Sequence, residues 1–319
     1  MVLAYMKTWL DRSITTRELF FLLTLIFCFS PLISPPGALL LGLVFAHLIG
    51  HPFLHLNHKA THYMLQLSVV GLGFGMNLAG AWKAGSQGFL LTLFSIAVTL
   101  AGGFLLGRVF QTEKKASFLI SAGTAICGGS AIAAISPVIQ AEEKQISVAL
   151  GTVFILNSVA LFVFPILGHA WHLSQSQFGL WCAIAIHDTS SVVGAAGRYG
   201  PEALQVATVV KLARALWIIP VTVVSAFVFK RKASKVKIPY FIAWFVLAMV
   251  ANTYIPFVGH YGHFLVDFSK GGLTVTLFLI GCGLNRRVLG SVGWKPFFQG
   301  VLLWILIGVS SLVTIRCFL

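Results

Sequence analysis

Long apolar stretches follow one another along almost the whole chain, separated by short polar loops. About 20 apolar residues in a helix span the hydrocarbon core of a bilayer, which is about 30 Å thick. The pattern predicts eleven hydrophobic segments, at about residues 19–34, 36–50, 62–82, 88–109, 115–140, 144–168, 177–197, 201–229, 238–257, 264–285 and 296–317. We therefore predict an all-α polytopic membrane protein with about 9–11 transmembrane helices, in which residues 1–319 form a single transmembrane transporter domain.

Two of these segments are interrupted by polar, glycine-rich sequence. The segment at about 115–140 contains GTAICGGSAIAA, and the segment at about 177–197 contains HDTSSVVGAAG. Backbone leaves the helical conformation at membrane depth only where it is buried in protein or lines a wet cavity. We predict two interrupted or re-entrant helices here and expect the functional site between them.

An internal repeat is indicated by the strings GFGMN (Gly73–Asn77) and GCGLN (Gly281–Asn285), each of which closes an apolar span. Inverted repeats are a usual construction of secondary transporters. If both interrupted segments return to the side from which they enter, spans three and ten, four and eleven, six and eight, and two and nine all run oppositely. If both cross the membrane, spans six and eight become parallel. We favour the re-entrant arrangement and keep full crossing as the alternative.

Composition and charge agree with a membrane protein. Hydrophobic residues make up 58% of the chain and charged residues 9%, which is too little polar surface for a soluble globule. The net charge of +14 does not indicate nucleic-acid binding, because no soluble basic patch with interleaved aromatics carries it. By the positive-inside rule, the basic residues place the N-terminus and the Lys230–Lys237 loop in the cytoplasm.

Metal and disulfide chemistry are not expected. The cysteines show no CxxC spacing and lie in apolar segments: Cys28, Cys127, Cys182, Cys282 and Cys317. The pairs His51/His55 and His58/His62 have the i,i+4 spacing of a zinc site. Their loop contains Pro52 and lacks nearby carboxylates or thiols, so we predict no metal and no cofactor.

The first polar passage offers backbone donors for an anion. Gly128 and Gly129 free the chain from helical angles, and Thr124 and Ser130 add hydroxyl groups. A half-helix beginning at Ala131 would present unpaired N–H groups and a partial positive charge. The alternative is a packing kink, because small residues also let helices approach closely. Cys127 is mainly a small packing residue on this interpretation and a further candidate contact for the substrate.

The second passage holds a carboxylate deep in an apolar span. Asp188 is surrounded in sequence by His187 and by the hydroxyl groups of Thr189, Ser190 and Ser191. Charged residues within membrane spans usually pair or have a function. We predict that His187 and Asp188 couple transport to a proton or a sodium ion, while the three hydroxyl groups contact the substrate.

Two cations, Lys211 and Arg214, lie three residues apart in the middle of the eighth span, so they share one helical face. Asp188 can neutralise only one of them. The surplus positive charge predicts an anionic substrate; the alternative is a structural Asp188–Arg214 pair with Lys211 extended to an interface.

Three asparagines also lie in or at the end of apolar spans. For Asn157, hydrogen bonding between helices and contact with the substrate are equally plausible. We assign Asn77 and Asn285 to ion coupling because of their symmetric placement in the repeat.

The strings CGGSAIAA and HDTSSVVGA, with their flanks over Gly123–Asn157 and Ala185–Pro220, resemble the YeiH-like sulfate exporter family of bacterial inner-membrane proteins. This resemblance covers nearly the whole chain and implies a secondary transporter of ten to eleven spans in the bacterial cytoplasmic membrane. The first string is also similar to the broken core helix of bile acid/sodium symporters. Only one span separates the two interrupted segments here, so the sodium ligands of that fold are not carried over.

These observations lead us to expect a secondary transporter of a small anion, such as sulfate or an organosulfonate, driven by a proton or sodium gradient. No ATP-binding motif is present. The expected partners are the anion, the coupling ion and membrane lipid, and homo-oligomerisation stays open. We do not expect an enzyme; the alternatives are an intramembrane enzyme using Ser130 or Cys127 with His187, and a channel or sensor.

Overall fold

The computed structural model describes residues 15–229, 240–284, 290 and 292–318, and this part of the chain contains helices and no β-strand. The helices are α2 (Thr16–Phe29), α3 (Pro35–Leu48), α4 (Leu54–Leu72), η1 (Gly73–Gly75, a short 3-10 helix), α5 (Leu78–Val109), α6 (Lys114–Ala125), α7 (Gly129–Ile139), α8 (Glu143–Ala170), α9 (Gln175–Ala185), α10 (Thr189–Tyr199), α11 (Pro201–Ala215), α12 (Ile218–Val228), α13 (Phe241–Tyr254), α14 (Pro256–Gly283) and α16 (Trp294–Phe318). The all-α prediction is confirmed.

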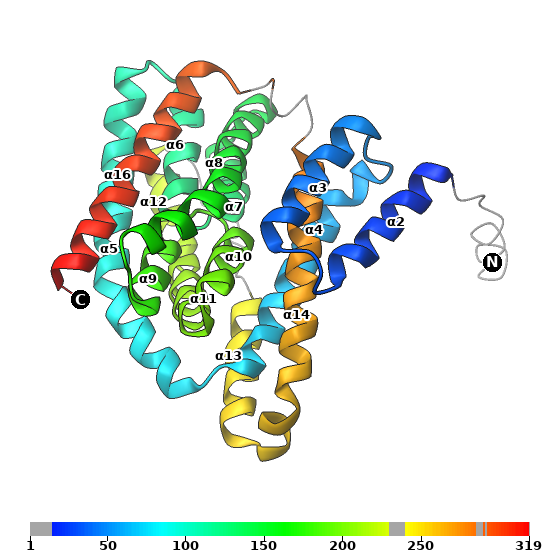
Figure 1. Ribbon diagram of the computed structural model, residues 1–319. Coiled ribbons are helices and arrows are strands. Elements are labelled where there is room, and N and C mark those ends of the chain that lie inside the picture. The colour runs from blue at the N-terminus through cyan, green and yellow to red at the C-terminus, as the bar shows by residue number, and fades with distance from the viewer. Residues whose placement is uncertain (1–14, 230–239, 285–289, 291, 319) are drawn as a thin grey trace, which may run out of the picture.

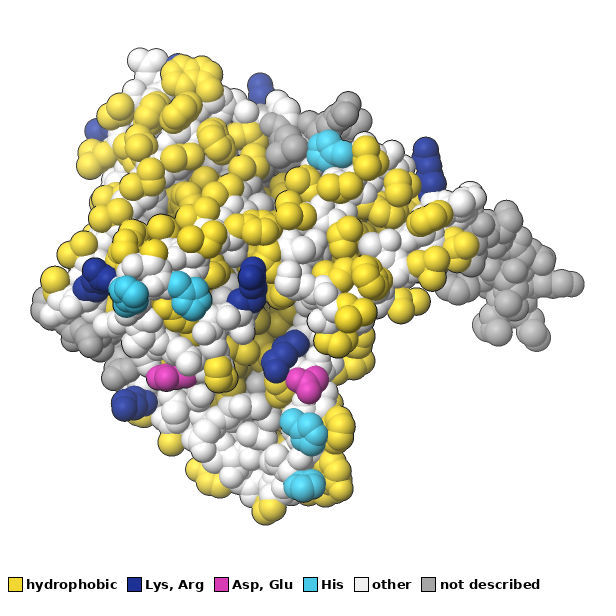
Figure 2. All heavy atoms as spheres, in the orientation of Figure 1, with side chains coloured by type: hydrophobic (Ala, Val, Ile, Leu, Met, Phe, Trp, Pro, Cys, Tyr) yellow, Lys and Arg dark blue, Asp and Glu magenta, His cyan; other side chains and the backbone are white. Residues whose placement is uncertain are grey.

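Several helices are long and apolar enough to cross a membrane. Among the described residues there are five, at Gly88–Val109, Glu143–Ala170, Pro201–Val228, Pro256–Gly283 and Trp294–Cys317. A further candidate joins Leu54–Gly75 to Leu78–Ser86 across a bend of 112°. Hydrophobic side chains cover much of the face drawn in Figure 2, and charged side chains are few. The chain is therefore a polytopic membrane protein, and the other predicted segments form shorter or broken helices.

The helices form two groups that stand side by side (Figure 1). We call α5–α12 with α16 the core bundle, and α2–α4 with α13 and α14 the panel. Within the panel, α14 packs against α2, α3, α4 and α13. Contacts between the groups run mainly from α10 to α14 and α3, from α8 to α3, and from α5 to α13. An apolar cavity of about 210 Å³ opens where α3 meets α8. Fewer helix pairs are therefore in contact between the two groups than within each group.

Pairs of helices run in opposite directions, as the repeat predicts. In the panel, Gly71 of α4 lies against Ser269 of α14, and Gly75, just past α4, lies against Val266. In the core bundle, Gly102 of α5 lies against Leu306 of α16, and Gly107 against Gln299. In both pairs one residue number falls as the other rises. The predicted antiparallel arrangement of spans three and ten, and of spans four and eleven, is confirmed.

The eighth predicted span is present as one membrane-length segment, Pro201–Val228, with a local turn that the sequence interpretation missed. Residues 216 and 217 form a turn between α11 and α12. Pro220 has no N–H to offer the carbonyl of Leu216, four residues earlier, so the helix cannot continue regularly there. That carbonyl accepts from the N–H of Ile219 instead, at 3.2 Å. Arg214 therefore lies near the middle of the span, directly before a turn at which the backbone hydrogen bonding is irregular.

Candidate functional site

The first interrupted segment is a helical hairpin, which we call hairpin 1 (α6, residues 126–128 and α7). Its two ends lie together: the Lys115 ammonium, in the first turn of α6, donates to the carbonyl of Gln140, just after α7, at 2.7 Å. The Gln145 amide at the start of α8 also donates to the Glu113 carboxylate just before α6. Hairpin 1 therefore returns to the side from which it enters.

The second interrupted segment is a similar hairpin, hairpin 2 (α9, residues 186–188 and α10). The Tyr199 hydroxyl at the end of α10 donates to the carbonyl of Leu173, before α9, at 2.6 Å. The N–H of Glu202 donates to the side-chain oxygen of Gln175 at 3.0 Å. Hairpin 2 also closes on itself, at the C-terminal end of α8, whereas hairpin 1 closes at its N-terminal end.

The tips of the two hairpins meet beside the middle of α8. Asn157, the central residue of this 28-residue helix, accepts from the N–H groups of His187 at 3.0 Å and Asp188 at 3.3 Å. The backbone of Gly128 lies against the carbonyl of His187. Because α8 spans the membrane, two hairpins that enter from opposite sides make contact near half depth. The closed bases of both hairpins favour the re-entrant arrangement. In this arrangement α8 and α11–α12 run oppositely, because α11 starts at the base of hairpin 2.

Chemical labelling tests this arrangement. In a background with the exposed Cys317 replaced by serine, we expect Gln111→Cys and Glu143→Cys, which flank hairpin 1, to react with an impermeant thiol reagent from the same side of the membrane. His169→Cys and Glu202→Cys, which flank hairpin 2, should react only from the opposite side. Labelling of Gln111→Cys and Glu143→Cys from opposite sides would show that hairpin 1 crosses the membrane.

Each half-helix that leads away from a tip begins with a distinct cap. Gly128 precedes α7 with a φ of 66° and a ψ of −124°, which only glycine adopts readily. Asp188 precedes α10, and its carboxylate accepts from the N–H of Ser191 at 3.3 Å and from the Ser190 hydroxyl. Both half-helices direct the positive ends of their dipoles toward the tips. At α10 that charge is already balanced by Asp188, whereas no acidic side chain caps α7.

Lys211 is fully buried and bonded to helix α9. Its ammonium donates to the carbonyls of Ile186 at 2.6 Å and Ala183 at 3.2 Å, which end α9. A cation at a helix C-terminus is stabilised by the unpaired carbonyls and by the dipole. The alternative that Lys211 extends to an interface is therefore wrong: the side chain holds hairpin 2 in shape.

Arg214 is fully buried, and two of its three guanidinium nitrogens have no hydrogen-bond partner among the described residues. Nη1 donates to the Ser95 hydroxyl of α5 at 2.6 Å, while Nε and Nη2 have no partner among the described residues. The ion pair among the described residues joins Lys270 to Asp267, and Asp188 and Arg214 do not form one. The predicted alternative of a structural Asp188–Arg214 pair is therefore wrong. A buried charge without a counter-charge is costly, which makes Arg214 the unbalanced cation of this site.

Other buried polar atoms around the tips have no hydrogen-bond partner in the part of the chain that the structure describes. They are the Thr124 hydroxyl, the side-chain nitrogen of Asn157 and both ring nitrogens of His187. Cys127 and His187 are electrostatic neighbours of both Lys211 and Arg214, which places these groups in one region. Buried polar groups in proteins are almost always hydrogen-bonded to protein, water or ligand. A cluster of unmatched donors therefore indicates a place for a polar ligand.

The other residues predicted to contact the substrate lie at the start of α10 and at the start of α7. Ser190, Ser191 and Thr189 are buried in the first turn of α10, Gly129 opens α7, and Ser130 is exposed there. Since neither ring nitrogen of His187 has a partner, neither Ser130 nor Cys127 is hydrogen-bonded to it in this conformation.

The two asparagines of the repeat lie away from the tips or outside the described chain. Asn77 caps α5 by accepting from Ala79 at 2.8 Å and Gly80 at 3.4 Å, in the bend that packs on α13. Asn285 and the Lys230–Lys237 loop lie outside the described residues.

Ser95 is a functional candidate that the sequence interpretation missed. Its own proton goes to the carbonyl of Thr92 at 2.8 Å, so its oxygen is left to accept from Arg214. The signal was present in the sequence: Thr92, Ser95 and Thr99 recur at helical spacing on one face of an otherwise apolar span, and all are buried.

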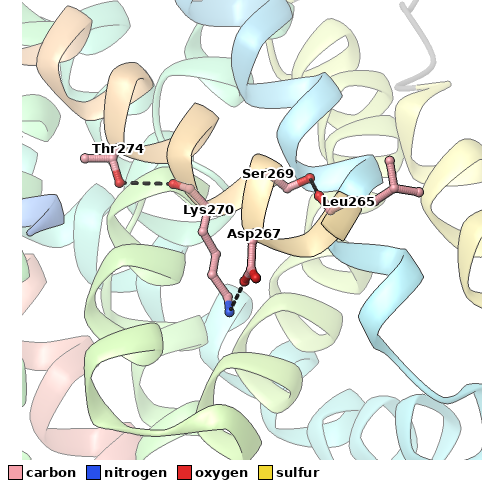
Figure 3. Close-up of polar contacts among 5 residues, drawn as sticks. All are labelled: Leu265, Asp267, Ser269, Lys270 and Thr274. Carbon is pink, nitrogen blue, oxygen red and sulfur yellow. Dashed lines mark hydrogen bonds and ion pairs between the residues drawn. The ribbon is translucent and has the colours of Figure 1, made fainter. Parts of the chain in front are cut away.

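A separate charged pair lies on α14 of the panel. Lys270 and Asp267 of α14 form an ion pair at 3.2 Å, with side chains 54% and 70% exposed (Figure 3). Lys270 lies two helical turns before Leu277, which packs on Gly194 of α10, so both face the core bundle. Charged residues within a membrane span usually face water or protein.

Fold and site together define a polytopic membrane protein with two opposed re-entrant hairpins around a buried polar centre. The family model described as "Conserved hypothetical protein 698" matches residues 21–300. The chain is 53% identical over 285 residues to a UPF0324 membrane protein of Bacteroides thetaiotaomicron, covering 89% of this chain and 86% of that one. It is 51% identical over 291 residues to a UPF0324 membrane protein of Porphyromonas gingivalis, covering 90% and 88%. The chain belongs to this family of membrane proteins. No solved structure matches it.

Proposed function

We propose that this protein is a secondary transporter that moves a small anion, such as sulfate or an organosulfonate, by alternating access. The observation that carries the proposal is the meeting of two opposed hairpins at half depth, around buried donors that lack partners. Discontinuous helices whose ends meet near the midplane are the usual binding sites of such transporters.

The charge balance favours an anion. Lys211 and Arg214 contribute two positive charges, and Asp188 is the carboxylate at the tips. The first turn of α7 adds a partial positive charge without an acidic cap. A cationic substrate would meet net repulsion at this place.

The contacts between core bundle and panel differ for the two hairpins, which favours alternating access. On hairpin 2, Gly194 packs closely against Leu277 of α14 and Pro35 of α3. On hairpin 1, α7 packs mainly on α6, α8 and α12 and exposes Ser130, Ala133 and Pro137. Access therefore runs along α7, while hairpin 2 is sealed against the panel. If the core bundle moved relative to the panel, hairpin 1 would close against the panel and hairpin 2 would open.

The distribution of basic residues gives the orientation. The end of the core bundle where hairpin 1 closes carries Arg108, Lys114, Lys115, Lys144 and Lys295. The opposite end carries Lys83, Arg198 and Arg316. By the positive-inside rule, this distribution supports a cytoplasmic position for hairpin 1 in a bacterial cytoplasmic membrane, and the basic residues of the N-terminal sequence support an N-terminus inside.

Transport into proteoliposomes tests the proposal. We expect saturable uptake of radiolabelled sulfate or methanesulfonate that requires an imposed pH or sodium gradient, with counterflow in the absence of a gradient. Liposomes without protein are the control. Flux that does not saturate would identify a channel, and the absence of both uptake and counterflow across these anions would refute a transporter of this class.

A further inference from the structure

We propose that Arg214 alone selects the substrate, and that it selects an oxyanion able to present two oxygen atoms to one edge of the guanidinium group. This inference rests on the proposed anion site and defines its chemistry. It assigns different roles to the two buried cations that the sequence treats as equivalent.

The free atoms of Arg214 form one recognition edge. Nε and Nη2 are adjacent donors on the same side of the planar guanidinium group, and both are unpartnered. Two parallel N–H groups match two oxygen atoms of a carboxylate, sulfate, sulfonate or phosphate. A halide offers a single acceptor atom, so the two parallel N–H groups must converge on it with bent hydrogen bonds and match it less well than two oxygen atoms.

The remaining donor holds this edge in place. Nη1 donates to Ser95 at 2.6 Å, and the Ser95 proton is directed to the carbonyl of Thr92 at 2.8 Å. The guanidinium group is therefore fixed by a hydroxyl on α5, in a second helix of the core bundle. A group held by a supporting hydrogen bond loses less conformational freedom when a ligand binds.

Lys211 is not available for this role. Its ammonium contacts two carbonyls at the end of α9 and stabilises the shape of hairpin 2. Asn157 is oriented by the two N–H groups that its oxygen accepts, which leaves its side-chain nitrogen as a neutral donor near the tips. Arg214 therefore supplies the directed charge, and Asn157 adds a neutral contact.

Binding measured by thermal unfolding of the purified full-length protein tests the inference. Sulfate, methanesulfonate, acetate and inorganic phosphate are compared with chloride and bromide at equal ionic strength. We expect at least one oxyanion, and neither halide, to raise the unfolding temperature of the wild type in a saturable way. The response among the four oxyanions identifies which group the site takes.

The Arg214→Lys variant keeps the positive charge and removes the two adjacent donors Nε and Nη2. We expect its affinity for the bound oxyanion to fall by about tenfold or more, since a bidentate charged contact is replaced by a single point charge. The matched control is Arg198→Lys, the same change at an exposed arginine at the end of α10, which should bind as the wild type does. If Arg214→Lys does not fold, Ser95→Ala serves instead: it keeps the edge, loses its anchor and should bind more weakly.

Several outcomes would overturn the inference. They are unchanged affinity in Arg214→Lys, unchanged affinity in Ser95→Ala where Arg214→Lys does not fold, equal stabilisation by halides, or no stabilisation by any of the four oxyanions. Measuring flux in the same variants separates the inference from the proposed function. Flux that is unaffected by Arg214→Lys would support the transport function and refute the proposed role of Arg214 in selecting the substrate. Selective binding of an oxyanion without any flux would support the role of Arg214 and refute the transport function.

Discussion

Replacing Gly128 with alanine is expected to push the two hairpin tips apart and to abolish transport. Gly128 has a φ of 66° and a ψ of −124°, and a side chain in such a conformation costs about 1–3 kcal/mol. The added methyl group would also lie 3.2 Å from Cγ1 of Val153 and 3.4 Å from the carbonyl of His187. Neither neighbour can withdraw easily, because Val153 is buried in α8 and the backbone N–H of His187 is bonded to Asn157.

The measurement compares the unfolding temperature in detergent and the flux in proteoliposomes. Gly197→Ala is the matched control, because its added methyl group would meet only Leu204, at 3.9 Å. In a helix this control should be neutral or stabilising by about 0.5–1 kcal/mol. Wild-type stability and flux in Gly128→Ala would show that the tips do not need this contact.

The architecture followed from sequence only where local patterns determine it. Apolar length predicted the long helices, and Gly128 with the His187–Ser191 string predicted both breaks. The choice between re-entrant and crossing segments depends on bonds such as Lys115 to Gln140, which join residues 25 apart. Charge bias could not decide it, because both arrangements keep the basic Lys230–Lys237 loop on the same side.

The sequence predicted which residues lie near the site, but not the different roles of Lys211 and Arg214. Lys211 and Arg214 share a helical face, so sequence alone gives both the same meaning. Their acceptors distinguish them: backbone carbonyls that carry no sequence signal for Lys211, and a hydroxyl 119 residues away for Arg214. The turn after Arg214 follows from Pro220, which the sequence does contain. Its effect was missed because the surrounding residues are uniformly apolar.

Replacing Asp188 with asparagine is expected to leave hairpin 2 folded and to uncouple transport from its driving gradient. Asparagine caps a helix about as well as aspartate, so the bond from the N–H of Ser191 can persist. The substitution removes the carboxylate at the tips, the group there that can bind a proton or a sodium ion. Asp188→Ala loses both the charge and the cap, and should cost about 1 kcal/mol in addition.

The two consequences of this substitution are measured separately. Counterflow without a gradient reports substrate binding and movement, whereas gradient-driven accumulation also requires the coupling ion. Linked sites typically share a coupling free energy of about 1–3 kcal/mol, so accumulation in Asp188→Asn should fall by at least about fivefold while counterflow continues. Glu202→Gln removes an exposed carboxylate at the base of the same hairpin and should retain wild-type accumulation. Full accumulation by Asp188→Asn would mean that another group carries the ion, and His187, whose ring nitrogens have no partner among the described residues, would become the next residue to replace.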